Sequence, residues 1–399
     1  MRDLSIYIHI PFCVRKCLYC DFLSFPVDGL GKKCGREKAE SGSGVHRQEV
    51  ESYVNLLEQE IRQSAENYTE YRVISVFWGG GTPSILPAED ISRIMEVINE
   101  AYQIAGDAEI TIEMNPGTVD ARKMGQYITA GMNRISIGLQ SADDKELVRI
   151  GRIHDYGAFL ETYELARNAG FCNINIDIMA SLPGQGILSY EQTLRSVAAL
   201  EPEHISAYSL ILEEGTPLYE NQSEYQFPSE EEDREMYTLT KEYLASSGYH
   251  RYEISNYAKK GFECRHNKVY WQRGDYLGFG LGASSMVQNV RWKNPDGMAA
   301  YAAYVDRLAG KPEEFILDRQ TLTVPEQMEE YMFLGLRMMC GVSRREFAGV
   351  FGCRIEDVYG ETIDRLCRQG LLYGEKERIR LTDKGIDVSN YAMSQFLFD

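Results

Sequence analysis

The stretch Tyr7-Ile8-His9-Ile10-Pro11-Phe12-Cys13-Val14-Arg15-Lys16-Cys17-Leu18-Tyr19-Cys20 decides how the rest of the chain is interpreted. An alternating apolar segment predicts a strand, and three cysteines follow it with the spacing C-x3-C-x2-C. Three close thiolates can each ligate one iron of a cubane cluster, which leaves the fourth iron free to bind another molecule. The alternative is a structural zinc ion with His9 or Cys34 as its fourth ligand. Zinc sites usually add a second C-x2-C pair, and this sequence has none, so the spacing favours the cluster.

Length, charge and cysteine usage narrow the class of protein. The chain has 399 residues, enough for one large and one smaller domain, and a net charge of −18. Such acidity disfavours a nucleic-acid partner, because phosphate backbones bind basic surfaces. The odd number of scattered cysteines indicates free thiols in a reducing compartment. No apolar run is long enough for a membrane span and no signal peptide precedes the first strand, so we expect a cytoplasmic protein.

Alternating strand and helix patterns predict an α/β fold. Six β-then-α units in succession indicate a parallel sheet with right-handed crossovers. We expect strands at 5–10, 73–78, 109–114, 134–139, 172–178 and 204–210. Helical periodicity covers 48–66, 88–104, 120–130, 155–169, 189–200 and 230–247. The pattern fits both an open sheet and a sheet curled into a barrel.

The rest of the chain divides into a loop, an irregular extension and a C-terminal module. Residues 26–47 are Gly- and Ser-rich and predict a mobile surface loop, whereas 248–322 is aromatic-rich and less regular than the core at 1–247. In 323–399, helices at 326–340, 343–350 and 355–369 precede short β-like segments at Leu371–Tyr373 and Arg378–Leu381. This order predicts a small winged-helix-like module. Its acidity favours a lid or docking role over DNA binding.

Small and polar residues follow the expected strands at their carboxyl ends. Gly79-Gly80-Gly81-Thr82-Pro83 follows the second strand, and its glycines would let the backbone approach a ligand and expose its N–H groups. The later strand ends carry Glu113, Gln140 and Asp177, with Arg152 shortly after Gln140. A carboxylate there can bind an ammonium group, and an arginine can bind a carboxylate. Taken singly, each residue fits a turn, a helix cap or a solvated charge equally well.

Taken together, these motifs resemble the radical S-adenosylmethionine (SAM) proteins, and within them the oxygen-independent coproporphyrinogen III oxidase family. The resemblance implies a partial (β/α)6 barrel and a [4Fe-4S] cluster on Cys13, Cys17 and Cys20, with SAM on the open iron. It implies that SAM and the cluster are contacted by Tyr7, Tyr19, Gly80, Gly81, Thr82, Glu113, Gln140, Arg152 and Asp177. It also places Gly278-Phe279-Gly280-Leu281-Gly282-Ala283 in the wall of the active site.

Two features separate the branches of that family. Oxidases carry a further cysteine two residues after the last cluster cysteine, and this chain has Phe22 there. Oxidases also carry an N-terminal extension, whereas the first expected strand here begins within the first few residues. His266-Asn267-Lys268-Val269-Tyr270-Trp271 matches the HNxxYW motif of the HemW-type heme chaperone branch. A histidine can ligate heme iron and aromatic rings can pack on a porphyrin, so the resemblance makes His266 a candidate heme ligand, with Cys264 as an alternative.

The resemblance therefore predicts a heme chaperone that binds a [4Fe-4S] cluster, SAM and heme. Its partners would be heme-accepting proteins, including a transiently bound membrane protein, although the chain itself shows no membrane segment. The alternative is an oxygen-independent coproporphyrinogen III oxidase or another radical SAM enzyme. A transfer-RNA-modifying enzyme is a third alternative, which the acidic charge disfavours.

Overall fold

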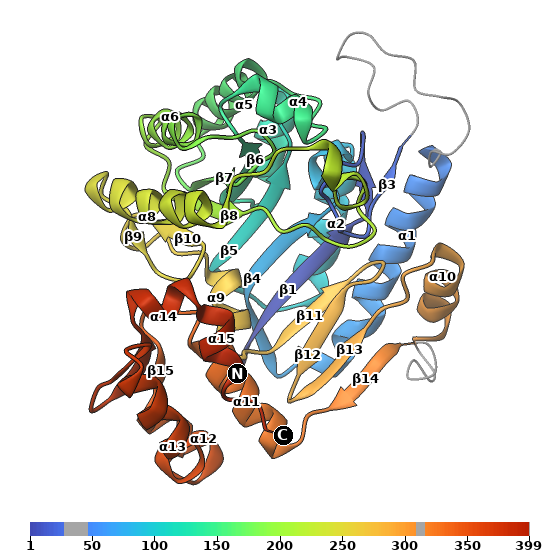
Figure 1. The fold of residues 1–399 in the computed structure, drawn as a ribbon. Helices are drawn as coiled ribbons and strands as arrows, with labels where there is room; N and C mark the ends of the chain where they lie inside the picture. The colour runs from blue at the N-terminus through green and yellow to red at the C-terminus, as the bar shows by residue number, and fades with distance from the viewer. Residues whose placement is uncertain (28–46, 309–315, 399) are drawn as a thin grey trace.

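A computed structural model describes residues 1–27, 47–308 and 316–398 of the chain. Within these residues, one sheet of twelve strands dominates the molecule, and a three-stranded sheet belongs to the C-terminal module (Figure 1). The cysteine loop adds a short parallel pair, β2 (Phe12–Cys13) and β3 (Phe25–Pro26). The mobile loop expected at 26–47 falls almost entirely outside the described residues, and so does Cys34.

Six parallel strands form the middle of the large sheet, and each overlaps its expected range. In spatial order they are β1 (Arg2–Ile10), β4 (Tyr71–Gly80), β5 (Ile104–Met114), β6 (Arg134–Gln140), β7 (Ile174–Ala180) and β8 (His204–Ser209). A parallel sheet is covered on both faces, so its strands are apolar along most of their length. Every residue of β6 is buried. Among the described strands β1 does not pair with β8, so the curved sheet stays open, as in a partial barrel.

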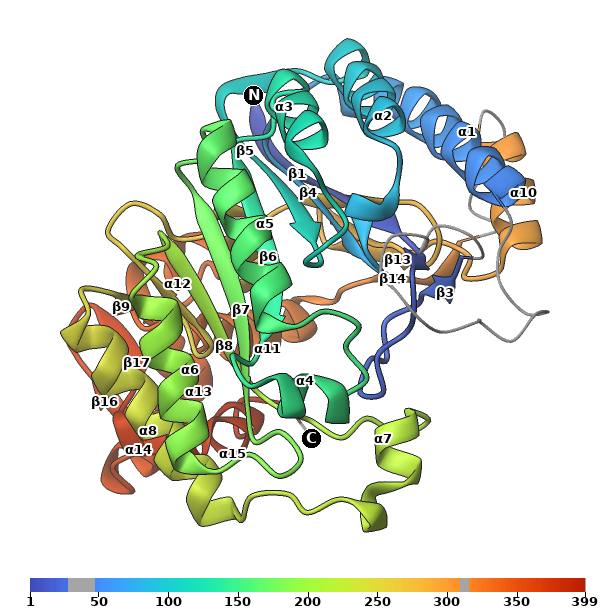
Figure 2. The ribbon, with the colours of Figure 1, turned by 90° about the horizontal axis from the view of Figure 1, so that it is seen from above.

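Helices cover one side of this sheet, as right-handed crossovers require. The row consists of α1 (Arg47–Ser64), α2 (Ala88–Ala101), α3 (Ala121–Thr129), α5 (Tyr156–Ala169), α6 (Ile187–Ala198) and α8 (Glu230–Ser246). Neighbouring helices pack on one another, α1 on α2, α2 on α3, and α6 on α8 (Figure 2). Short helices α4 (Asp144–Arg149) and α7 (Pro217–Glu220) instead follow the carboxyl ends of β6 and β8.

The sheet extends beyond the six strands on both sides, which the sequence did not predict. On one side lie β10 (Asn256–Ala258) and β9 (His250–Arg251). On the other side, β11 (Tyr276–Phe279) runs parallel to β1 and leads to β12 (Ser284–Val287), β13 (Val290–Lys293) and β14 (Leu317–Thr321). Helices α9 (Arg265–Trp271) and α10 (Met298–Arg307) connect these strands. Strands this short carry too few alternating positions to be recognised from sequence.

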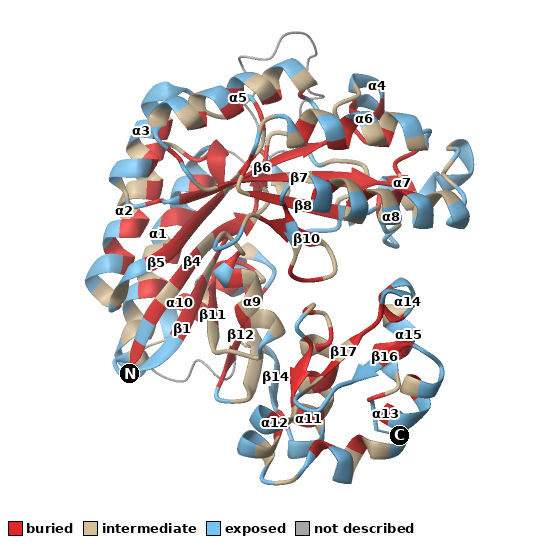
Figure 3. Ribbon diagram, turned by 90° about the vertical axis from the view of Figure 1, so that its left-hand side faces the viewer, coloured by how far each residue is buried: buried red, intermediate tan, exposed pale blue. Residues whose placement is uncertain are grey.

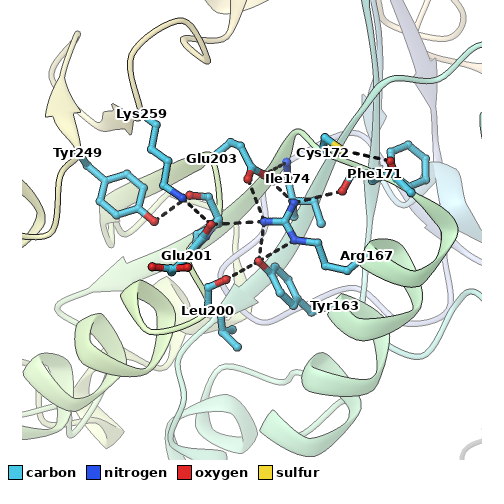
Figure 4. Close-up of polar contacts among 12 residues, drawn as sticks. Tyr163, Arg167, Phe171, Cys172, Ile174, Leu200, Glu201, Glu203, Tyr249 and Lys259 are labelled. Atoms are coloured by element: carbon cyan, nitrogen blue, oxygen red, sulfur yellow. Dashed lines mark hydrogen bonds and ion pairs between the residues drawn. The ribbon is translucent and has the colours of Figure 1, made fainter.

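The amino-terminal ends of β7 and β8 are fixed by a polar cluster, shown in Figure 4. Arg167 on α5 donates to both carboxylate oxygens of Glu203, at 2.8 and 3.1 Å, and to the Tyr163 hydroxyl. Glu203 also accepts the Ile174 N–H at 3.0 Å. A bidentate arginine pair of this kind holds a loop in one geometry. This end of the sheet is therefore a structural anchor, which leaves the opposite end for chemistry.

The C-terminal module has its own small core (Figure 3). Its elements are α11 (Val324–Gly335), β15 (Val342–Ser343), α12 (Arg344–Phe351), α13 (Ile355–Arg368), β16 (Leu372–Gly374), β17 (Arg378–Leu381), α14 (Asp383–Asp387) and α15 (Ser389–Ser394). The antiparallel sheet β15-β17-β16 against α12 and α13 agrees with the expected winged-helix-like arrangement. The module is joined to the sheet by the nearly buried Glu330, which pairs with Arg273 and Arg291.

A fully buried carboxylate joins α1 to the added part of the sheet. Glu60 Oε2 accepts the Gly280 N–H at 2.8 Å and the Tyr301 hydroxyl at 2.6 Å, and Oε1 accepts Asn294 Nδ2 at 2.7 Å. Burial raises the pKa of Glu60 to about 7, although these three hydrogen bonds favour the charged form. All three partners donate, so the position requires an acceptor at both oxygens, which a carboxyl group offers even when protonated because its hydroxyl oxygen can also accept.

We expect Glu60→Gln to lower the free energy of unfolding by about 1–3 kcal/mol near pH 5.5, because its NH2 group would face donors. Folding raises the pKa of Glu60 from 4.5 to about 7, so its protonated form is favoured in the folded state. Wild-type stability contributed by Glu60 is therefore present below about pH 4.5 and is lost as pH rises toward about 7. Urea unfolding followed by circular dichroism should show that the difference in free energy of unfolding between wild type and Glu60→Gln shrinks by up to about 3 kcal/mol by pH 8. A constant advantage over this range would contradict the titration, and the exposed Glu66→Gln is the control.

Candidate functional site

The carboxyl ends of β4, β5, β6 and β7 meet the cysteine loop around a pocket of about 330 Å³. Because parallel strands end at the same edge of a sheet, the residues that follow them are brought together. Of the expected site residues, the pocket is lined by Cys13, Cys17, Tyr19, Cys20, Gly80, Gly81, Thr82, Glu113, Gln140, Arg152 and Asp177. Tyr7 and His266 do not line it. We call this the cysteine pocket.

The glycine segment after β4 holds the cysteine loop in place. Gly81 N–H donates to the Ile10 carbonyl and Thr82 N–H to the Phe12 carbonyl, both at 2.8 Å. A Cβ at Gly81 would lie 2.6 Å from the Phe12 carbonyl oxygen, so only glycine allows this approach. The expectation that the glycine N–H groups face a ligand is therefore wrong for Gly81. The N–H groups of Gly81 and Thr82 bind the cysteine loop instead.

The three cysteines of the loop lie at one wall of the pocket. Cys13 is buried and accepts a hydrogen bond from Thr82 Oγ1 at 3.6 Å, whereas Cys17 and Cys20 are half-buried. Burial raises the pKa of Cys20 to about 11. Among the described residues, no three His, Cys, Asp or Glu side chains are gathered closely enough to hold one metal ion. A cubane does not require such gathering, because each thiolate binds a different iron.

A hydrogen-bonded chain links the arginine of the pocket to this loop. Arg152 donates to Asn115 Oδ1 at 2.7 Å, and Asn115 Nδ2 donates to Thr82 Oγ1 at 2.8 Å. Arg152 Nε is buried without a partner among the described residues. A buried guanidinium N–H without an acceptor is costly, and a ligand carboxylate would satisfy it.

Two partly buried carboxylates, Glu113 and Asp177, line the same pocket. Burial, and then the charge of Asp177, raise the pKa of Glu113 to about 8. Burial also raises the pKa of Asp177, although Asn175 at 2.7 Å and Ser136 at 3.0 Å donate to it. Two acidic groups held this way favour a ligand with positive charge. SAM carries a sulfonium, an ammonium and a carboxylate, so the acidic pair and Arg152 together match its charges.

Several lining residues were not identified from the sequence. Asn115, Ser136 and Tyr208 also line the pocket. Asn115 directly follows the end of the expected strand 109–114. Tyr208 lies near the carboxyl end of the expected strand 204–210. The rule that functional side chains follow strand ends would have found both residues.

His266 lies apart from the cysteine pocket, on α9. Its side chain is only 1% exposed, with Nδ1 at 2.9 Å from Ser75 Oγ and Nε2 at 2.8 Å from the Tyr270 hydroxyl. Burial lowers its pKa to about 3, so the imidazole is neutral. Both ring nitrogens are engaged, and ligation of iron would require one of these bonds to break. Cys264 is also buried and its thiol donates to Glu109 at 3.4 Å, so the alternative ligand is no more accessible.

Tyr7 lies on β1 beside this region. Its hydroxyl is 3.1 Å from His9 Nδ1, and its ring stacks on Phe77 with centroids 6.4 Å apart. Tyr7 lines a neighbouring pocket together with Tyr270 and with Gly282 and Ala283 of the expected active-site wall. Of the expected contact residues, Tyr7 therefore lines the neighbouring pocket, and His266 lines neither pocket.

Comparison with known proteins agrees with this geometry. The radical SAM superfamily model matches residues 7–197, and the HemN C-terminal domain model matches 322–388. The heme chaperone HemW of Bacillus subtilis is 34% identical over 98% of this chain and 99% of its own length. The heme chaperone HemW of Escherichia coli is 33% identical over 100% and 99%. The structure of coproporphyrinogen III oxidase (HemN) from Escherichia coli superposes with a TM-score of 0.82 at 24% identity, covering 99% of this chain and 90% of that one, which shows a shared fold.

The described residues include no helix that is long and apolar enough to cross a membrane. Three findings support the same family assignment. Several HemW proteins are more than 30% identical over the full length, the radical SAM model matches the cysteine loop and the strands that follow it, and the HemN C-terminal domain model matches the C-terminal module. The chain belongs to the radical SAM superfamily and, within it, to the HemW heme chaperone family.

Proposed function

We propose that this protein is a heme chaperone of the radical SAM type, which binds a [4Fe-4S] cluster, SAM and heme and delivers heme to acceptor proteins. The observation that carries the cofactor assignment is the cysteine pocket, where three cysteines face two carboxylates and an arginine. The names of its full-length relatives support the heme role. Free thiols on every described cysteine are consistent with work in a reducing compartment.

Each group in the pocket then has one task. Cys13, Cys17 and Cys20 would hold three irons of the cluster, and Tyr19 would cover it. When bound, a reduced cluster supplies the electron for cleavage of SAM. Glu113 and the carbonyls of Gly80 and Gly81 would accept hydrogen bonds from the ammonium of SAM, and Arg152 would bind its carboxylate. Gln140, Thr82 and Asp177 would orient the remaining polar groups of SAM.

The backbone at Gln140 supports a positioning role for that residue. Gln140 ends β6 with a φ of +74°, a left-handed conformation that is strained for a residue other than glycine. Such strain persists where the surroundings require one side-chain direction. At this strand end the side chain is directed into the pocket, where it is a lining residue.

The cluster assignment predicts about four irons per chain after anaerobic reconstitution. Replacing any one of Cys13, Cys17 or Cys20 by serine removes a ligand and should abolish the cluster. Cys264→Ser and Cys34→Ser are matched controls that should retain it. Iron analysis and EPR of the reduced protein measure the outcome. A protein that holds zinc and cannot be rebuilt with iron would contradict the assignment.

The SAM assignment predicts that Glu113→Gln and Asp177→Asn weaken SAM binding by about 1–3 kcal/mol each, the scale for a hydrogen bond to a charged group. Isothermal titration of the reconstituted protein with SAM measures the change, with the exposed Glu89→Gln as the control. Unchanged affinity in both pocket variants would remove these carboxylates from the site.

The heme assignment predicts tight heme binding without conversion of coproporphyrinogen III under anaerobic reducing conditions with SAM. We expect His266→Ala to weaken heme binding. Tyr270→Phe tests how His266 acts, because it breaks the 2.8 Å contact between the two side chains but keeps the imidazole. If His266 ligates iron, only His266→Ala changes the heme absorption spectrum. Steady formation of protoporphyrinogen would favour the oxidase and overturn the chaperone proposal.

A further inference from the structure

A second and larger pocket, of about 700 Å³, adjoins the cysteine pocket. It lies between the cysteine loop and the added strands β11, β12 and β13, and we call it the edge pocket. Its lining includes Tyr7, His9, Lys16, Phe22, Phe25, Tyr270, Tyr276, Ser284 and Lys293. Lys16 and Phe22 line both pockets and form the wall between them. None of the cluster or SAM roles proposed above uses the space inside it.

Aromatic side chains, among polar ones, contribute to several walls of the edge pocket. Tyr270 and Tyr276 meet edge-to-face with ring centroids 4.7 Å apart, and Phe22 is 65% exposed on the cysteine loop. The exposed Phe22 ring is therefore free to contact a ligand in the adjoining pocket. Aromatic rings on opposing walls suit a flat, apolar ligand.

Two lysines and two aspartates line the same pocket, so it offers charges of both signs to a ligand. Lys16 comes from the cysteine loop and Lys293 from β13. Within the described residues neither lysine forms an ion pair. Asp21 and Asp296 also line the pocket, and both are exposed. Lysines from separate elements, without ion-pair partners, suit a ligand with two separate carboxylates.

We propose that the edge pocket binds heme, with the porphyrin between the aromatic walls and its two propionates at Lys16 and Lys293. The assignment rests on the proposed chaperone function and specifies where its ligand lies. The pocket volume falls in the range of sites for ligands of this size, roughly 300–1,000 Å³. Both nitrogens of the His9 ring already have partners, at Tyr7 and Leu23, so recognition rests on the lysines and the aromatic walls.

This location also explains the part played by His266. Its Nε2 lies 2.8 Å from the Tyr270 hydroxyl, and its ring packs edge-to-face on Tyr270 at 5.0 Å. Tyr270 belongs to the same HNxxYW segment and lines the edge pocket. His266 is then a positioning residue that fixes one aromatic wall, while its own ring stays buried.

The test compares heme with heme dimethyl ester, whose propionates carry no charge, on the reconstituted full-length protein. Wild type should bind heme about tenfold more tightly than the ester, since two partly exposed ion pairs contribute about this much. The variant K16Q/K293Q should lose that preference, and the equally charged control K145Q/K376Q should keep it. Iron content, measured alongside, shows whether the cysteine loop still carries its cluster.

A second variant tests the space without changing charge. Ser284 is exposed on β12 and lines the edge pocket, so Ser284→Trp fills the pocket from a position that folding tolerates. It should abolish heme binding and leave SAM binding unchanged. Heme binding that survives both Ser284→Trp and K16Q/K293Q with its preference intact would overturn the edge-pocket site and leave the chaperone function standing. Absence of heme binding by the wild type would overturn both.

Discussion

Two backbone hydrogen bonds between neighbouring strand ends hold the site together. The chain leaves the sheet after Ile10, and the N–H groups of Gly81 and Thr82 bind the Ile10 and Phe12 carbonyls. Because β1 and β4 are parallel and adjacent, with Ile10 opposite Gly80, this contact forms only when the central sheet is in register. The cysteine loop therefore takes its position from the sheet, and a side chain at Gly81 would displace it.

Charge in the cysteine pocket follows from the same geometry. Glu113 near the end of β5 and Asp177 within β7 lie on the two strands that flank β6, where burial removes part of the water that would stabilise their charges. The buried Arg134 guanidinium lowers the pKa of both carboxyl groups, and Arg152 is linked through Asn115 to Thr82. The pocket thus presents charges of both signs, an arrangement that suits a ligand carrying both signs. Stability given up by burying these groups is recovered when such a ligand binds.

The sequence predicted the parts of the structure that depend on local pattern. Continuous apolar runs located all six central strands, and the strand-end rule brought the cysteines, Glu113, Arg152 and Asp177 to one pocket. The added strands β11 to β14 were missed because each has only four or five residues, and β11 is placed by pairing with the distant β1. The burial of His266 could not be predicted from the sequence either, since its partner Ser75 lies 191 residues away.

The wall shared by the two pockets bears on whether the protein carries heme or oxidises coproporphyrinogen III. The resemblance described above implies a cysteine in the oxidases at the position of Phe22, which lines both pockets here. A thiol there could give up a hydrogen atom or ligate a metal, whereas a phenyl ring can only pack against its neighbour. Lys16, the other residue of the wall, offers a fixed positive charge and no redox chemistry. In the proposed heme site, a wall made of these two side chains would hold a porphyrin without reacting with it, as carriage of unchanged heme requires.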